Sequence, residues 1–173
     1  MCAHRLTVMG VAGCGKSTLA AELARALNIA LIEGDDHHSE HNQDKMRHGI
    51  SLDDADRLPW LDALATLLAR CDGGAVLTCS ALKRRYRERL RASVPDLRIV
   101  FLDITPDAAR YRVSERAAHL FPASLVGSQF EALESPLGEP GVLRIDAGQV
   151  PAVQRDTVLD WLGHTLSLSN STT

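Results

Sequence analysis

Residues 10–17 of the chain read Gly-Val-Ala-Gly-Cys-Gly-Lys-Ser, and a short apolar run at residues 6–9 comes directly before them. This is the pattern G-x-x-x-x-G-K-[ST], a glycine-rich turn that joins a β-strand to an α-helix. The turn directs successive backbone N–H groups at one point, where the helix dipole adds positive potential for a phosphate. The pattern therefore predicts an α/β fold that binds a nucleoside triphosphate, but it does not identify the acceptor of a phosphoryl group.

Individual residues of this loop have expected parts in binding the nucleotide. Lys16 can reach the β- and γ-phosphates, and the Ser17 hydroxyl can hold Mg²⁺. Cys14 lies beside a helix N-terminus, where a thiolate is favoured, so we expect it to be alkylated more slowly when nucleotide is bound. The residues of this region that we predict to bind the nucleotide are Gly10, Ala12, Gly13, Cys14, Gly15, Lys16, Ser17 and Thr18.

The rest of the chain alternates short apolar runs with helical patterns, as in a doubly wound α/β fold. Short continuous apolar runs are typical of strands buried on both faces of a parallel sheet. Two polar segments, residues 36–58 and 117–140, do not fit simple crossovers; we expect the first to bind substrate and the second to be a mobile lid. The predicted strands are residues 6–9, 29–32, 75–77, 99–102 and 142–145, and the predicted helices are 18–27, 56–71, 84–92, 106–116 and 153–162.

Length and composition narrow the class of protein further. A chain of 173 residues with 45% apolar side chains suits one domain with an aliphatic core, and residues 167–173 are expected to fray. The net charge of −3 gives no general attraction to nucleic acid or anionic lipid, and no apolar stretch is long enough to span a bilayer. The four Cys form no C-x-x-C pair, which favours reduced thiols. We expect a cytoplasmic protein that binds neither nucleic acid nor membranes.

Acidic residues follow the second predicted strand. Asp35 should emerge at the carboxyl edge of the sheet, which is also the edge that carries the phosphate loop. There it could accept a proton from an attacking hydroxyl or help to hold Mg²⁺ through water. Asp36 is as well explained as a helix cap. Residues 78–80, after the third strand, contain no Asp that could serve as a further magnesium ligand, which makes Asp35 more important.

Residues 37–41 read His-His-Ser-Glu-His, which matches the zinc-peptidase pattern H-x-x-E-H. A metallopeptidase would need a further ligand and a substrate cleft in a chain already committed to nucleotide binding. The plainer interpretation is the solvated polar face of a helix. A third interpretation is that one of these His side chains forms a hydrogen bond with a polyhydroxylated substrate.

Basic residues suggest where anions bind. Only three of the 19 Lys and Arg residues are Lys, and Lys83 among them follows the third strand, where it could hold an anionic substrate. Arg112 lies on a helix that enters the second polar segment and could close over phosphates. Arg110 is better explained as a surface partner of Asp107 or Glu115. Most of the remaining Arg residues that follow Lys83 fit a solvated helix face; they are Arg84, Arg85, Arg87, Arg89 and Arg91.

Taken together, these residues are similar to the gluconokinases of the short, phosphate-loop type, which are related to shikimate and nucleoside monophosphate kinases. The resemblance covers nearly the whole chain. Ser39 departs from it, because the family tends to have Pro there, and so do residues 120–121, where Phe-Met is usual. Besides the phosphate loop, the residues that carry it include Asp35, His38, Asn42, Lys45, Leu52, Asp54, Arg57, Trp60, Ser80, Lys83, Tyr86, Arg87, Arg116, His119, Pro122, Gln129, Phe130, Glu134 and Pro136.

The resemblance implies ATP-dependent phosphorylation of the 6-hydroxyl of D-gluconate to 6-phospho-D-gluconate, with Mg²⁺ and usually in a homodimer. It implies a P-loop NTPase fold, with a five-stranded parallel sheet in the order 2-3-1-4-5 and helices on both faces. Lys16 and Ser17 would serve ATP and Mg²⁺, Asp35 would be the base, and Arg116 would be the flap cation that meets ATP beside Arg112. The residues expected to bind the sugar acid are Asp35, His38, Arg57, Ser80, Lys83 and Gln129.

Other classes of protein fit the chain less well. A shikimate or nucleoside monophosphate kinase is the nearest alternative, and a panel of acceptors with ATP separates the two. A regulatory GTPase would need an N-K-x-D segment, which none of the three Lys residues provides. A nucleic-acid-binding module would need an accessible basic face and an affinity that falls steeply with salt.

Overall fold

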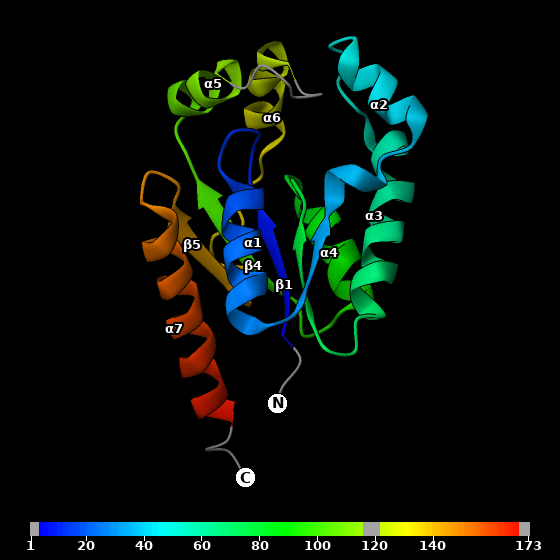
Figure 1. Ribbon diagram of the computed structural model, residues 1–173. Helices are drawn as coiled ribbons and strands as arrows, with labels where there is room; N and C mark the ends of the chain where they lie inside the picture. Colours follow the sequence, from blue (N-terminus) through cyan, green and yellow to red (C-terminus); the bar gives the residue numbers. More distant parts are fainter. Residues whose placement is uncertain (1–3, 116–121, 170–173) are drawn as a thin grey trace.

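A five-stranded parallel sheet forms the centre of the molecule (Figure 1). The computed structural model describes residues 4–115 and 122–169, with side chains up to residue 163. All neighbouring strands are parallel, in the order β2-β3-β1-β4-β5, which confirms the predicted fold class and strand order. The strands are β1 (Arg5–Met9), β2 (Ala30–Glu33), β3 (Ala75–Thr78), β4 (Arg98–Asp103) and β5 (Val142–Asp146).

Helices cover both faces of the sheet, and each face has its own apolar core. Side chains alternate across a strand, so Leu6 and Val8 of β1 enter one core while Met9 enters the other. The first core takes α1, α5 and α7, and the second takes α3 and α4. The helices are α1 (Lys16–Leu27), α2 (Glu40–Arg47), α3 (Asp54–Ala69), α4 (Arg84–Ser93), α5 (Pro106–Ser114), α6 (Val126–Ala132) and α7 (Pro151–Ser169), with short 3-10 turns η1 (Gly34–His37) and η2 (Ala123–Leu125).

The prediction that every strand is buried on both faces is wrong for the two edge strands. The side chains of β3 are buried throughout, whereas Leu31 of β2 is 40% exposed and Arg144 of β5 is exposed. An edge strand has a neighbour on one side only, so the covering helices do not enclose it fully. The two edge strands of this sheet are therefore partly exposed to solvent, whereas β3 is fully buried.

Local capping explains where two helices begin. Asp53 accepts a hydrogen bond from the backbone N–H of Asp56 at 2.9 Å, and the Asp56 carboxylate accepts one from the N–H of Asp53 at 2.9 Å. This capping box starts α3 two residues before the predicted residue 56. Ser39 caps α2 by accepting from the N–H of Asn42 at 3.2 Å, so a hydroxyl begins the helix where the resembling family tends to have Pro.

The polar segment 36–58 is not a loop throughout, because it contains the end of η1, all of α2 and the start of α3. The part of segment 117–140 that is described contains η2 and α6, which stand with α5 over one side of the sheet's carboxyl edge, while α2 stands over the other (Figure 1). Within the segment 167–173, which the sequence predicts to fray, residues 167–169 continue α7. No helix in the described ranges has the length and hydropathy needed to cross a membrane.

Candidate active site

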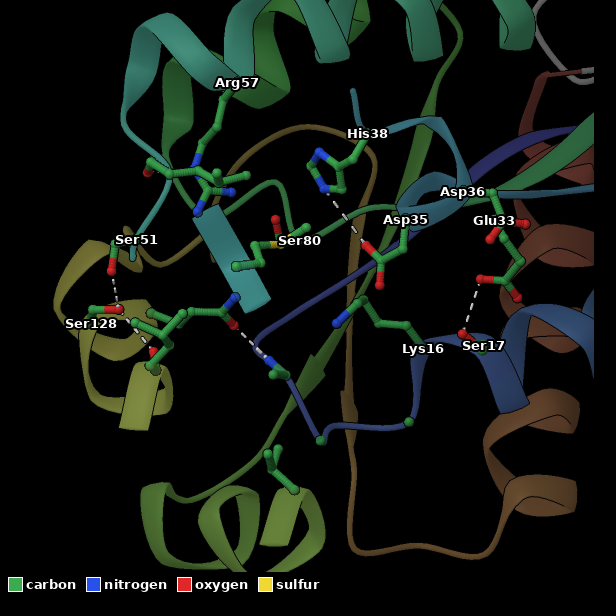
Figure 2. Close-up of a pocket in the computed structure, with 18 of the residues that line it drawn as sticks. Lys16, Ser17, Glu33, Asp35, Asp36, His38, Ser51, Arg57, Ser80 and Ser128 are labelled. Atoms are coloured by element: carbon green, nitrogen blue, oxygen red, sulfur yellow. Dashed lines mark hydrogen bonds and ion pairs between the residues drawn. The ribbon is translucent and has the colours of Figure 1, made fainter. Parts of the chain in front are cut away.

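A cavity of about 390 Å³ lies between the phosphate loop and the segments that stand over the sheet's carboxyl edge (Figure 2). The sequence prediction that the loop and Asp35 face one space is confirmed, since both line this cavity. Gly10, Cys14, Lys83 and Arg112 do not line it, and Arg116 lies outside the described residues. The predicted residues that do line it are Ala12, Gly13, Gly15, Lys16, Ser17, Thr18, Asp35, His38, Arg57, Ser80 and Gln129.

The phosphate loop is held in shape by glycine geometry and by Lys16. Gly13 has a φ of +81°, and a Cβ there would come within 2.8 Å of the Ala109 carbonyl oxygen, so no larger residue fits. Lys16 Nζ donates to the carbonyl oxygens of Gly10 at 3.1 Å and Val11 at 3.0 Å. The ammonium group thus lies against the loop at the N-terminus of α1. This arrangement fits a bound triphosphate, because backbone donors, the helix dipole and one cation converge.

The expectation that Cys14 is a reactive thiol is wrong. The residue is 1% exposed and belongs to the apolar core that α1 and α5 share. The loop turns this side chain inward as it wraps around the phosphate position, so the thiol does not face the cavity. Cys79, the other cysteine near the site, is also buried, and burial raises the pKa of its thiol to about 12.

Ser17 contacts a carboxylate that the sequence analysis did not single out. Its hydroxyl donates to Glu33 Oε2 at 3.0 Å, and the same oxygen accepts from Thr78 Oγ1 at 2.7 Å. Thr78 stands opposite Glu33 in the sheet and also accepts from the Gly34 N–H at 3.0 Å. A Cβ on Gly34 would collide with the Thr78 carbonyl oxygen, so only glycine lets β2 end this close to β3. Glu33 therefore supplies a carboxylate where β3 itself ends in Thr.

Asp35 is an exposed carboxylate of the site, next to the exposed Asp36. Its side chain is 78% exposed, and Oδ1 lies 3.9 Å from His38 Nε2. Figure 2 shows the carboxylate between Lys16 and His38, directed into the cavity. Such a group can accept a proton from a hydroxyl that enters the cavity, or hold a magnesium-bound water. The residues that could hold Mg²⁺ are thus Ser17, Glu33 and Asp35.

The His38 side chain is buried and stacks on an aromatic ring, which corrects the interpretation of this segment as a solvated helix face. Its ring stacks on Trp60 with centroids 4.2 Å apart and planes 16° apart, and the Trp60 indole donates to the Gly34 carbonyl oxygen at 2.8 Å. Burial lowers the pKa of His38 to about 4, and the positive charge of Arg57 acts in the same direction, while Asp35 opposes both. The imidazole is therefore neutral at pH 7.

The tautomer of His38 follows from its neighbour. The Asn42 amide nitrogen donates to the Asp56 carbonyl oxygen at 3.0 Å, and it lies 3.5 Å from His38 Nδ1. An amide N–H₂ can only donate, so Nδ1 accepts and the ring proton is on Nε2, on the side of Asp35. His38 thus presents a neutral donor to the cavity.

The zinc-peptidase pattern does not form a metal site. His37 belongs to η1, and His41 lies in α2 with a side chain that is 73% exposed and 3.6 Å from Asp56. The two His residues are thus not on one helix, as the pattern requires. Throughout residues 4–115 and 122–163, no three His, Cys, Asp or Glu side chains come together in a way that could hold a metal ion.

Basic side chains from α3 and from the start of α4 lie at the other side of the cavity. Arg57 donates from Nε to the Leu52 carbonyl oxygen at 3.1 Å and lines the cavity with its guanidinium group. Lys83 lies next to it, in an adjoining cavity of about 170 Å³, and its Nζ is 3.0 Å from Asp54 Oδ1. Hydrogen bonds from Tyr86 and Lys83 lower the pKa of Asp54 to about 2. Asp54 is therefore ionised and fixes the position of the Lys83 ammonium group.

Gln129 of α6 contacts the phosphate loop directly. The residue is 8% exposed, and its Oε1 accepts a hydrogen bond from the Ala12 N–H at 2.6 Å. Because a backbone N–H can only donate, the amide oxygen must face the loop, which leaves the amide N–H₂ group for the cavity. Ser128, the residue before it, lies 3.1 Å from Ser51 Oγ on the opposite segment.

The arginines around the site differ in burial and in what they contact. Arg110 forms an exposed pair with Asp107 at 3.1 Å, which confirms the prediction for it. The prediction that Arg87 lies on a solvated face is wrong, because it is fully buried, pairs with Glu139 at 2.5 Å and donates to the Ala81 carbonyl oxygen at 2.9 Å. Arg112 donates to the carbonyl oxygens of Gly13 at 3.5 Å and Ala147 at 2.9 Å, so it supports the phosphate loop from outside the cavity.

A parallel sheet of this strand order, with a glycine-rich phosphate loop between β1 and α1, defines a P-loop nucleotide-binding protein. The family model described as "AAA domain" matches residues 6–140. The chain is 42% identical over 151 residues to a gluconokinase of Gluconobacter oxydans, covering 86% of this chain and 85% of that protein. It is 40% identical over 151 residues to the thermosensitive gluconokinase of Escherichia coli, covering 84% and 80% respectively.

Solved structures agree with these relatives. A crystal structure of a gluconokinase from Sinorhizobium meliloti is 38% identical and superposes with a TM-score of 0.89, covering 98% of each chain. These similarities extend over sheet, phosphate loop and α6 together. The chain belongs to the gluconokinase family, within the wider AAA family of P-loop proteins.

Proposed function

We propose that this protein transfers the γ-phosphoryl group of ATP to the 6-hydroxyl of D-gluconate, giving ADP and 6-phospho-D-gluconate. The names of its relatives support this acceptor. The observation that carries the proposal is that one cavity is lined both by the phosphate loop and by the exposed Asp35 carboxylate. Phosphoryl transfer needs little beyond such positioning and charge stabilisation.

The chemistry assigned to the residues follows from their contacts. The backbone of residues 12–18 and the Lys16 ammonium group would bind the phosphates. Ser17 would hold Mg²⁺, with Glu33 and Asp35 supporting it through water, and the ion would neutralise charge between the β- and γ-phosphates when bound. Asp35 would accept the proton of the 6-hydroxyl as its oxygen bonds to the γ-phosphorus and the bond to ADP breaks.

The acceptor would lie against residues that offer neutral and cationic donors. His38 would donate from Nε2 to a hydroxyl of the sugar acid, since its ring is neutral at pH 7. Ser80 and the amide N–H₂ group of Gln129 would donate to other hydroxyls. Arg57 and Lys83 would attract the negative charge of the acid.

Several further features belong to the same proposal. Arg112 and Arg116 would serve the ATP side, with Arg116 outside the described residues. The segment that carries α6 would act as a lid, opening to admit substrates and closing through its contact between Gln129 and Ala12. We further propose a homodimer in the cytoplasm, on the strength of the family resemblance.

A coupled assay of ADP formation tests the acceptor directly. The purified protein is offered ATP, Mg²⁺ and, separately, D-gluconate, shikimate and the nucleoside monophosphates. We expect kcat/KM for gluconate to exceed that for the other acceptors by at least about 100-fold, because hydrogen-bonding sites reject acceptors that leave their donors unpaired. The Lys16→Ala variant serves as the control for contaminating kinases. Preference for shikimate or for a nucleotide would refute the proposal.

A further inference from the structure

The adjoining cavity of about 170 Å³ is a side chamber of the larger one. Its walls include Ser51, Leu52, Arg57, Ser128 and Gln129, which also line the larger cavity, so the two are continuous. Behind this shared boundary, it is closed by residues at the start of α4, including Lys83 and Tyr86. A group that enters the larger cavity can therefore extend into the chamber.

The charges along the two cavities are separated. The carboxylates Glu33, Asp35 and Asp36 line the larger cavity, and no Asp or Glu among the described residues lines the side chamber. The side chamber instead has the two cations Arg57 and Lys83. We call the part of the site around Lys16, Ser17, Glu33 and Asp35 the phosphate end. The part around Arg57, Lys83, Ser128 and Gln129 is the acceptor end.

Arg57 and Lys83 both keep hydrogen-bond donors that are available to an anion. Arg57 uses Nε for the Leu52 carbonyl oxygen, and no hydrogen bond or ion pair in the described ranges involves its two terminal N–H₂ groups. Lys83 donates one of its three N–H groups to Asp54, and this hydrogen bond holds the ammonium group beside the chamber. Apolar walls at Leu52 and Leu82 reduce the water around them, which strengthens a charge-assisted hydrogen bond.

We propose that this side chamber binds the carboxylate group of the sugar acid, through Arg57 and Lys83. The inference rests on the proposed function and specifies the direction in which the acceptor lies. With the carboxylate held at the acceptor end, the carbon chain runs toward the phosphate end. The hydroxyl farthest from the carboxylate then meets Asp35 and the phosphate loop, which accounts for phosphorylation at position 6. An acceptor in the opposite direction would bring its carboxylate against Glu33 and Asp35.

A comparison of D-gluconate with D-gluconamide tests the chamber, because the amide keeps the carbon chain and its hydroxyls but removes the negative charge. The variants are Lys83→Met and Arg57→Met. We expect each to lower kcat/KM for gluconate by about 10- to 100-fold, the range for a charge-assisted hydrogen bond. The loss for gluconamide should be less than about threefold, so the ratio between the two acceptors falls toward one.

Arg85→Met is the matched control. Arg85 also contacts Asp54 and lies against the Tyr86 ring, so it belongs to the same ion-pair cluster, but it does not line the chamber. Its loss removes one positive charge without removing a proposed ligand. We expect the gluconate-to-gluconamide ratio to stay within about twofold of the wild type.

Calorimetric binding of both acceptors accompanies the kinetics, so the result does not depend on turnover. If the ratio of kcat/KM for gluconate to that for gluconamide is unchanged in both Lys83→Met and Arg57→Met, the proposal that the chamber binds the carboxylate is wrong. Equal losses of kcat/KM for the two acceptors would have the same meaning. Wild-type protein that binds gluconate without phosphorylating it would defeat the proposed function alone. Circular dichroism melting curves identify a variant that fails to fold; the other variant then decides the outcome.

Discussion

The phosphate end and the acceptor end of the site differ in how the chain builds them. The phosphate end comes from two short stretches, residues 10–18 and 33–35, each at the end of a strand of the sheet. The acceptor end combines α3, the start of α4 and α6, which are brought together by contacts between residues far apart in sequence, such as Ser51 and Ser128. Nucleotide binding is therefore set by local backbone geometry, whereas acceptor binding depends on tertiary packing.

The largest effect should come from removing the base at the phosphate end. We expect Asp35→Asn to lower kcat by about 10²- to 10⁴-fold, the usual contribution of a positioned general base. Gluconate binding should change little, because the amide keeps the shape of the side chain. Stopped-flow and steady-state assays measure the first effect, and calorimetry measures the second.

Asp44→Asn is its control, since Asp44 is an exposed residue of α2 paired with Arg47. It loses the same charge away from the cavity and should retain wild-type rates. Normal turnover in Asp35→Asn would show that Asp35 is not the base.

The next effect concerns the contact that joins the two ends. Gln129→Met keeps the length of the side chain but removes both the acceptor of the Ala12 N–H and the amide donors. We expect kcat/KM to fall by about 10- to 100-fold, equally for gluconate and gluconamide, since the partly buried Ala12 N–H is left without its acceptor. Gln129→Glu keeps the acceptor and should lose less. Ser128→Ala removes the hydroxyl contacts with Ser51 and with the Leu125 carbonyl oxygen but leaves the Gln129 contact in place, so it should lower kcat/KM by less than about threefold.

A smaller effect separates the two carboxylates of the phosphate end. We expect Glu33→Gln to raise the Mg²⁺ concentration for half-maximal activity by about tenfold, because groups that orient a metal ligand commonly contribute that much to affinity. The reason is the hydrogen bond from Ser17 to Glu33 at 3.0 Å. Glu22→Gln, farther along α1, where Glu22 pairs with Arg25 and Arg155, should leave the Mg²⁺ titration unchanged. A titration that Glu33→Gln does not shift would leave Glu33 a purely structural residue.

The smallest effect at neutral pH is one of stability, at His38. Its pKa is about 4 in the folded protein against 6.5 in the unfolded chain, so between these values the unfolded state binds the extra proton. Stability should therefore fall as pH decreases from 6.5 to 4, by up to about 3 kcal/mol from this residue. Urea unfolding of His38→Phe, which keeps a ring beside Trp60, should show a flatter pH dependence. His37→Gln, at an exposed residue, should keep the wild-type slope.

The difference between the two ends also explains what the sequence could predict. The strand, the glycine-rich turn and the helix of the phosphate loop are local, so their spacing alone predicts their geometry. The position of Asp35 beside the phosphate loop could also be predicted, because the carboxyl ends of parallel strands lie at the same edge of a sheet. Glu33 does not stand out in the sequence because it is the last residue of its strand; the signal was the absence of a carboxylate after β3, where Thr78 instead contacts Glu33.

Long-range partners account for the errors. The sequence predicts that Arg87 lies on a solvated helix face with several other arginines. Nothing near it in the sequence indicates that it forms an ion pair with Glu139. From its sequence neighbours, His38 is expected on a solvated polar face. In the fold its ring instead stacks on Trp60 of α3, which lies beyond α2 in the sequence. Cys14 is expected to be reactive because it lies beside a helix N-terminus, yet the loop encloses its side chain. Residue type and spacing identify such side chains, while their burial depends on the assembled fold.

A crystal structure of the protein with gluconate and a non-hydrolysable ATP analogue tests the central claim most directly. The account predicts that the 6-hydroxyl lies within about 2.6–3.2 Å of the Asp35 carboxylate, and that the gluconate carboxylate contacts Arg57 and Lys83. A gluconate molecule bound in the opposite direction, with its carboxylate toward the phosphate loop, would contradict it.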